Sequence, residues 1–361
     1  MKTIDDAKKA LKINIIMDIF KNSKQFDEQY GKLEGQRVDK RFYNVDSNLL
    51  RPLIYELLTN TDCGYRLYMD ERIKEGYIPK SISCLLKQLS EHENEFGEIY
   101  KDREVTIHEV IGEIGEVGAL REVLSSQILN YFGCPTVYNA IVETLNKDNN
   151  VEFKVISADF MEGDKVFSTF DDYRCEISQG LEFAIKNINN KILNKIKTIS
   201  NEEKQKFIRD FIKTYFVRGY VLNDGDFYHC NIGQIVDPYQ HKISLINFDY
   251  ECSFCQWHQN SMLVNQKIKR FQKDIDYLRT HFPSEYKELM EDLKTLNIAF
   301  NEMLKSGEID FMRDVKPEYD YPVDFSSGTS HIYCELNNIL YRINTAIKEM
   351  ELVKWGLINI L

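Results

Sequence analysis

The chain has 361 residues, which is enough for one two-lobed domain or for two ordinary domains. Hydrophobic residues make up 43% and charged residues 29%, the balance of a folded chain and not of a disordered one. The net charge of −11 argues against nucleic-acid binding as the main role, because neutralising phosphates requires a basic face.

The sequence offers no signal for export or membrane insertion. Charged residues interrupt the apolar positions between Met1 and Phe20, and no apolar run reaches the length of about 18 residues that a spanning helix needs. The eight cysteines are scattered, which favours a reducing compartment. Cys252 and Cys255, followed by His258, lack the second ligand pair of a structural zinc site. We therefore expect a soluble protein with ordinary thiols. Injection into a host cell without a signal peptide would leave the same pattern.

The first 60 residues are expected to form an N-terminal helical extension. Apolar side chains recur at helical spacing over residues 1 to about 20, and residues 40 to 60 suggest a short strand or loop followed by a helix.

Two strands joined by a turn are expected next, over residues 64–68 and 81–87. Lys87 closes the apolar run of the second strand, with Lys80 and Lys101 as alternatives for a functional lysine. An exposed lysine at the end of a strand is the ordinary alternative.

A helix is predicted over residues 117–132, because Gly133 is a suitable C-cap and Pro135 follows it. Glu122 stands near its start and Glu116 is the alternative acidic residue. The glycines ahead of the helix do not form a G-x-G-x-x-G loop.

Residues 153–163 read as a strand that runs into a loop containing Asp159 and Met161. Two helices are predicted to follow, over residues 180–197 and 202–220.

The most informative stretch runs from Gly219 to Glu251. Asp226 and Asn231 form a D-x-x-x-x-N arrangement, and Asp249 follows eighteen residues after Asn231. Apolar runs at 232–236 and 243–246, separated by a turn, predict a β-hairpin. Such a hairpin would return the chain to nearly the same place, so Asn231 and Asp249 should lie close together.

Phosphoryl transfer needs this set of side chains. An Asp accepts or orients the attacking hydroxyl, while an Asn and a second Asp hold the magnesium ions that bridge the nucleotide phosphates. A few carboxylate and amide oxygens are sufficient for Mg²⁺, which keeps its other ligands as water.

The stretch from Asn223 to Asn231 resembles the atypical branches of the protein-kinase-like superfamily, the HipA-like and phosphoinositide-kinase-like branches above all. In those branches an Asp-x-His-x-x-Asn loop replaces His-Arg-Asp. This chain departs from the pattern, because His229 lies three residues after Asp226 and Asp249 is followed by Tyr-Glu.

The resemblance implies an α+β, bilobal protein-kinase-like fold, with a small sheet-containing N-lobe over residues 61–160 and a larger, mostly helical C-lobe over 161–361. It also implies a role for each candidate residue. Asp226 would be catalytic, with His229 ordering its loop, and Asn231 and Asp249 would bind magnesium. Lys87 and Glu122 would form the phosphate-binding ion pair. The hinge at Asp159 and Met161 would contact adenine.

After Glu251, one or two helices are predicted over residues 262–305, and a closing helix over 331–355. The first carries a basic run, which is either a solvated face or a site for an inositol phosphate or lipid headgroup. Its members are Lys267, Lys269, Arg270 and Lys273.

The function expected from the resemblance is an ATP- and magnesium-dependent kinase acting on protein Ser/Thr, of a bacterial effector type. One kind of such effector is activated by host inositol hexakisphosphate. A phosphoinositide kinase, a pseudokinase binding module and a nucleotidyl (AMP) transferase remain as alternatives.

Overall fold

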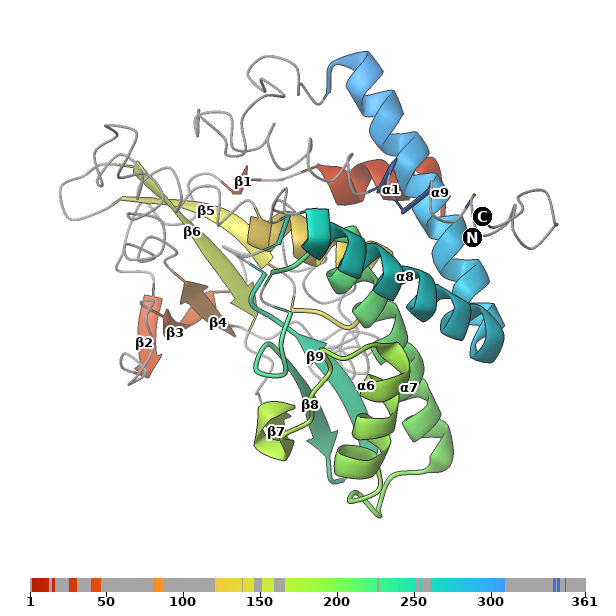
Figure 1. The fold of residues 1–361 in the computed structure, drawn as a ribbon. Helices are drawn as coiled ribbons and strands as arrows, with labels where there is room; N and C mark the ends of the chain where they lie inside the picture. The colour runs from red at the N-terminus through yellow and green to blue at the C-terminus, as the bar shows by residue number, and fades with distance from the viewer. Residues whose placement is uncertain are drawn as a thin grey trace.

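The computed structural model describes residues 2–12, 15–16, 26–30, 40–46, 81–87, 121–137, 139–145, 151–158, 166–225, 227–239, 241–250, 253–254, 261–308, 340–341, 343–344 and 348. These residues form an α+β structure with two sheets, one of six strands and one of three (Figure 1).

The larger sheet has the strand order β1-β5-β6-β4-β3-β2. Neighbouring strands are antiparallel except β1 and β5, which pair in parallel. In chain order the strands are β1 (Ile15–Ile16), β2 (Phe26–Tyr30), β3 (Lys40–Asp46), β4 (Ser81–Lys87), β5 (Asn139–Leu145) and β6 (Val151–Ala158). The strand predicted at residues 81–87 is confirmed as β4, whereas the strand predicted at 64–68 lies outside the described residues.

The N-terminal helix is shorter than predicted. Helix α1 (Ile4–Leu11) begins at a capping box in which Thr3 and Asp6 bond each other's backbone, and it ends at Leu11 instead of near residue 20. The β-branched pair Ile15 and Ile16 leaves the helix and pairs with Ile141 and Val142 of β5. Strands β1, β2 and β3 therefore lie within the segment predicted as an N-terminal helical extension, and β3 lies where the sequence predicts a short strand or loop.

Residues 121–131 form a helix at the centre of the molecule. Every side chain from Glu122 to Leu129 is buried, which shows that the helix is covered on all sides. It ends at Gly133 as predicted. The backbone angle φ there is +73°, Gly133 N–H donates to Asn130 O, and Cys134 N–H donates to Leu129 O, the pattern of a Schellman cap.

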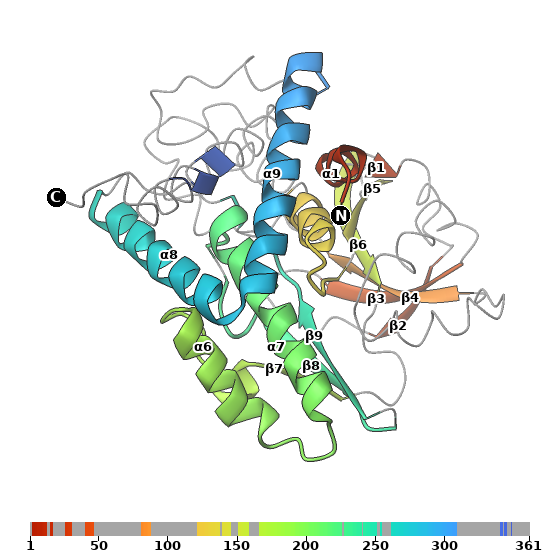
Figure 2. The same ribbon diagram turned by 90° about the vertical axis from the view of Figure 1, so that its right-hand side faces the viewer.

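The smaller sheet has the order β7-β8-β9, with β7 (Val166–Thr169), β8 (Ile232–Asp237) and β9 (Lys242–Asn247) all antiparallel. Helices α6 (Leu181–Ile188) and α7 (Asn201–Phe216) lie beside it (Figure 2). The Ser200 hydroxyl caps α7 by accepting from Glu203 N–H at 3.2 Å. Both predicted helices and the predicted hairpin are confirmed.

Two long helices follow, α8 (Ser261–His281) and α9 (Pro283–Ser306), as predicted for residues 262–305. Helix α1 packs on α9 (Figure 2), where Leu11 is fully buried. Of the predicted closing helix, residues 340–341, 343–344 and 348 are described and are helical. In the part of the chain that the structure describes, no helix is both long enough and apolar enough to cross a membrane.

Candidate active site

The β8–β9 hairpin brings the two predicted magnesium ligands to the same end of the small sheet. Ile232 opens β8 and pairs with Asn247, the last residue of β9. Phe248 N–H then donates to Asn231 O at 3.4 Å, so the chain immediately before β8 lies against the chain immediately after β9. The predicted approach of the Asn231 and Asp249 segments is confirmed at the level of the backbone.

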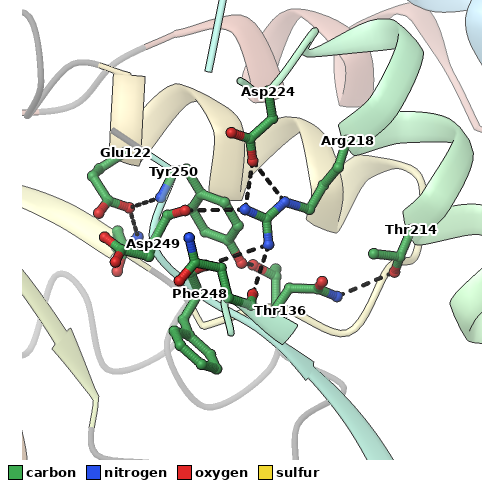
Figure 3. Close-up of polar contacts among 11 residues, drawn as sticks. Glu122, Thr136, Thr214, Arg218, Asp224, Phe248, Asp249 and Tyr250 are labelled. Atoms are coloured by element: carbon green, nitrogen blue, oxygen red, sulfur yellow. Dashed lines mark hydrogen bonds and ion pairs between the residues drawn. The ribbon is translucent and has the colours of Figure 1, made fainter. Parts of the chain in front are cut away.

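Arg218 lies between these two segments and is fully buried (Figure 3). Its guanidinium donates to Asn231 O at 2.7 Å, to Phe248 O at 3.3 Å and to Asp249 O at 3.0 Å. Asp224, in the loop after α7, accepts from both Nε and Nη2 of the same guanidinium. Arg218 thus joins the loop before β8 to the chain after β9 with one rigid, planar group.

The charge of Arg218 is balanced inside the protein. Burial, the largest single influence, lowers its pKa, but the charge and hydrogen bonds of Asp224 together with nearby Tyr250 and Asp249 raise the pKa above the ordinary arginine value. The rings of Phe227 and Tyr250 lie 4.9 Å and 4.8 Å from the guanidinium carbon and add cation–π contacts.

Arg218 reaches this position because α7 changes its winding at its end. Residues 217–221 form a π-helical turn, in which Leu222 N–H donates to Val217 O at 2.8 Å. Single π-turns occur often at functional sites because they redirect side chains without ending the helix. Asp224 N–H donates to Arg218 O at 3.0 Å and folds the loop back onto the turn.

Asp249 has an unusual backbone conformation, with φ at +65°. Residues other than glycine rarely occupy this left-handed region, and Asp and Asn are among the most tolerated there. Such outliers persist where surrounding contacts fix them and often mark functional sites.

Glu122 contacts the Asp249 segment from the central helix (Figure 3). Its Oε2 accepts from Tyr250 N–H at 3.0 Å and from the side-chain amide of Asn139 at 3.2 Å. The predicted partner, Lys87, is the last residue of β4, and its backbone pairs with Val155 of β6. The predicted Lys87–Glu122 pair stays a prediction.

Further buried hydrogen bonds hold Tyr250 and the end of β9 in place. The hydroxyls of Thr136 and Tyr250 are hydrogen-bonded at 2.5 Å, and burial is the main reason that the pKa of Tyr250 is raised. The Asn247 side-chain amide donates to Pro135 O at 2.7 Å and to the Thr214 hydroxyl at 3.1 Å. These bonds connect β9 to α7 and to the segment that follows the central helix.

Of the two predicted catalytic residues of the loop, the structure describes His229 but not Asp226. Asp226 lies outside the described residues, although its neighbour Phe227 is described. The His229 imidazole Nε2 lies 3.2 Å from Asp171 Oδ1, and Asp171 N–H donates to His229 O at 3.1 Å. His229 therefore contacts the short 3-10 helix at Asp171–Tyr173, and its role in ordering the loop stays a prediction.

Two other groups of predicted contacts can be located only in part. Asp159 and Met161 follow β6 and lie outside the described residues. Within the basic run on α8, Lys269 and Lys273 are exposed, whereas the Arg270 guanidinium donates to the Tyr215 hydroxyl at 2.6 Å. The side chain of Lys267 is not among those described.

The donor set at this end of the sheet suits a hard cation. The backbones of Asp249 and Asn231 meet there, and these residue types carry the carboxylate and amide oxygens that Mg²⁺ accepts while keeping several waters. Over the described residues, no cluster of three or more His, Cys, Asp or Glu side chains could hold a metal ion.

Sequence reasoning missed Arg218 and Asp224 and gave Glu122 a different partner. Arg218 bonds mostly to backbone carbonyls, which any residue type supplies, so the sequence around its partners carries no signal. The available hint was an arginine within the otherwise apolar end of a predicted helix, where a charge must be paired.

No family model matches the chain, and no curated protein matches it in sequence. Among solved structures it is similar to a Helicobacter pylori proinflammatory kinase, CtkA, with 12% sequence identity and a TM-score of 0.42. The match covers 75% of this chain and 92% of that one. A TM-score of 0.42 is too low to establish the fold or the activity of this chain.

Proposed function

We propose that the chain is an ATP- and magnesium-dependent phosphotransferase of an atypical kinase type. One observation carries the proposal. A single buried guanidinium, that of Arg218, joins the loop leading to Asn231 with the backbone of Asp249. The backbone of Asn231 and the backbone of Asp249 therefore lie together, which supports a shared magnesium site for these two residues of the kind that phosphoryl transfer requires.

Each residue has a distinct part in the proposed reaction. Asn231 and Asp249 would hold magnesium, which neutralises charge on the phosphates when it is bound. Asp226 would accept a hydrogen bond from the attacking hydroxyl and orient it. The contact of His229 with Asp171 would steady the loop that carries Asp226. Lys87 would contact the phosphates, and the segment of Asp159 and Met161 would contact adenine.

The proposed acceptor is a protein Ser/Thr hydroxyl, and a phosphoinositide hydroxyl is the alternative, because the same catalytic groups serve both. The proposal includes an effector that works inside a host cell and is activated by inositol hexakisphosphate. Exposed Lys269 and Lys273 on α8 are the basic residues that could contact such a ligand.

The proposal is tested by incubating the protein with magnesium and ATP labelled at either the α or the γ phosphate. Acceptors are a cytosolic protein extract or phosphoinositide vesicles, each with and without inositol hexakisphosphate. We expect γ label on protein, dependent on magnesium. Label from the α position would instead indicate nucleotidyl transfer, and γ label on lipid would indicate a phosphoinositide kinase. Nucleotide binding without any transfer would indicate a pseudokinase.

A further inference from the structure

The peptide group between Asp249 and Tyr250 is bonded at both of its ends. Its carbonyl, Asp249 O, accepts from Arg218 Nη2 at 3.0 Å, and its N–H, on Tyr250, donates to Glu122 Oε2 at 3.0 Å. The preceding peptide is also held, because Phe248 O accepts from Arg218 Nη1 at 3.3 Å. Both peptide planes that flank the Asp249 α-carbon are therefore fixed by side chains.

These contacts account for the backbone conformation of Asp249. Its φ of +65° is unfavourable for a residue with a Cβ, so surrounding bonds must hold it. Fixing both flanking peptides fixes φ and ψ of Asp249, and with them the direction in which its side chain leaves the backbone. Arg218 Nη1 also donates to the backbone carbonyl of Asn231 at 2.7 Å, so the same guanidinium restrains the backbone of the second proposed ligand.

The two side chains come from different parts of the molecule. Glu122 lies on the central helix and is 2% exposed, and Arg218 lies on the π-turn after α7 and is 0% exposed. With so little exposure, water cannot readily replace either side chain as the partner of the Asp249–Tyr250 peptide.

We propose that Arg218 and Glu122 are positioning residues that hold the Asp249–Tyr250 peptide and thereby orient the magnesium ligands Asp249 and Asn231. The inference rests on the proposed function and deepens it. It gives Glu122 a role that needs only an oxygen acceptor, whereas an ion pair with Lys87 needs a negative charge.

This difference makes Glu122→Gln and Glu122→Ala a discriminating pair of variants. Glutamine keeps an oxygen that can accept from Tyr250 N–H but loses the charge, and alanine loses both. Arg218→Lys keeps the charge but loses the planar fork that reaches carbonyls on both segments. Leu296→Ala, a fully buried site on α9, is the control for general loss of stability.

The experiment measures Mn²⁺ binding by electron paramagnetic resonance in the presence of the non-hydrolysable ATP analogue AMP-PNP. Rates of γ-phosphoryl transfer are measured in parallel, and thermal unfolding confirms that each variant is folded. We expect Glu122→Ala and Arg218→Lys each to weaken Mn²⁺ binding by about tenfold or more, the usual effect of removing a group that orients a metal ligand. Glu122→Gln should stay within about threefold of wild type, because it keeps the acceptor. Leu296→Ala should bind Mn²⁺ as wild type does.

Each other outcome has a defined meaning. Wild-type Mn²⁺ affinity in folded Glu122→Ala or Arg218→Lys would overturn the positioning role of that residue. Equal losses in Glu122→Gln and Glu122→Ala would overturn it for Glu122 and favour the ion pair with Lys87. If Arg218→Lys does not fold, the two Glu122 variants still decide the matter. Absence of Mn²⁺ binding and of phosphoryl transfer in the wild-type protein would instead refute the proposed function itself.

Discussion

Asp249 is held at a backbone angle that favours glycine, and its side chain is the proposed magnesium ligand. The conformational penalty and the chemical role can be separated by substitution. Asparagine tolerates the left-handed region nearly as well as aspartate does, glycine adopts it freely, and alanine does not. The three variants remove the carboxylate while changing the strain in different directions.

We predict that Asp249→Gly is more stable than Asp249→Ala, with a free energy of unfolding about 0.5–1 kcal/mol larger. Only alanine has a Cβ that makes the left-handed backbone conformation unfavourable. Both variants should lack phosphoryl transfer. Urea denaturation measures the first quantity and γ-labelled ATP the second. Arg174, with φ at +51°, is a matched control, since Arg174→Gly should be more stable than Arg174→Ala while both keep activity. Equal stability of the two Asp249 variants would contradict the strain argument.

At the scale of elements, Asp274 connects three helical segments. Its carboxylate, on α8, accepts from the first N–H of α6 at Leu181 (2.9 Å) and from the hydroxyls of Tyr215 (3.0 Å) and Tyr220 (2.6 Å). Asp274 is 5% exposed, so these donors have no ready replacement partner.

We predict that Asp274→Ala lowers the free energy of unfolding by about 3 kcal/mol, because it leaves several buried donors without an acceptor. Asp274→Asn, which keeps an oxygen, should cost about half as much. Asp276 is two residues away, exposed and paired with Arg279 at 2.6 Å, so Asp276→Ala should cost about 0.5 kcal/mol or less. Similar losses at 274 and 276 in chemical denaturation would contradict the proposed connecting role of Asp274.

The contact between α1 and α9 combines a buried apolar residue with exposed ion pairs. Leu11 is fully buried, while Lys8–Glu302 (2.8 Å) and Lys12–Glu308 (2.9 Å) lie at the surface. We predict that Leu11→Ala costs about 2–4 kcal/mol of unfolding free energy through the cavity it leaves. Lys12→Ala should cost about 0.5 kcal/mol or less. The ranking would be wrong if the lysine variant unfolded at lower denaturant than the leucine variant.

For the whole molecule, buried hydroxyls and thiols predict a loss of stability at high pH. Burial raises the pKa of Tyr215, Tyr220 and Tyr250 above the ordinary value of 10.0, and it raises the pKa of the Cys134 and Cys175 thiols from 9.0 to about 12. The unfolded chain then releases protons that the folded chain retains, so the stability these groups contribute is full below pH 9 and falls as pH rises above it.

Thermal unfolding between pH 8 and 11 measures this effect, with Tyr220→Phe as the test variant, since its deleted hydroxyl has a raised pKa. The variant should be less stable than wild type near neutral pH, because it loses the bond to Asp274. Its stability should then decline less steeply above pH 10. A wild-type profile that stays flat through this range would contradict the prediction.

Helices and turns that depend on neighbouring residues could be predicted from the sequence. Strand pairs and contacts between residues far apart in the chain could not. The hairpin at 232–247, both helices before it and the Gly133 cap follow from apolar spacing and turn residues that lie next to each other in the chain. Strand β2, with the sequence Phe-Asp-Glu-Gln-Tyr, is too polar and short to recognise, and it forms because β3 pairs with it. The contact of Glu122 with Tyr250 spans 128 residues and has a backbone N–H as its donor, so no residue type signals it.

The most direct test of the proposed phosphotransferase activity compares the wild-type protein with Asp249→Asn and Leu296→Ala in a γ-labelled ATP transfer assay with magnesium. AMP-PNP binding is measured on each protein without metal. Wild type and Leu296→Ala should transfer label, and Asp249→Asn should lose transfer by a factor of about 100 or more while it still binds the nucleotide analogue. Label transfer by Asp249→Asn at the wild-type rate would contradict the assignment of Asp249 to the metal. Absence of transfer by the wild-type protein with every acceptor and activator would contradict the phosphotransferase itself.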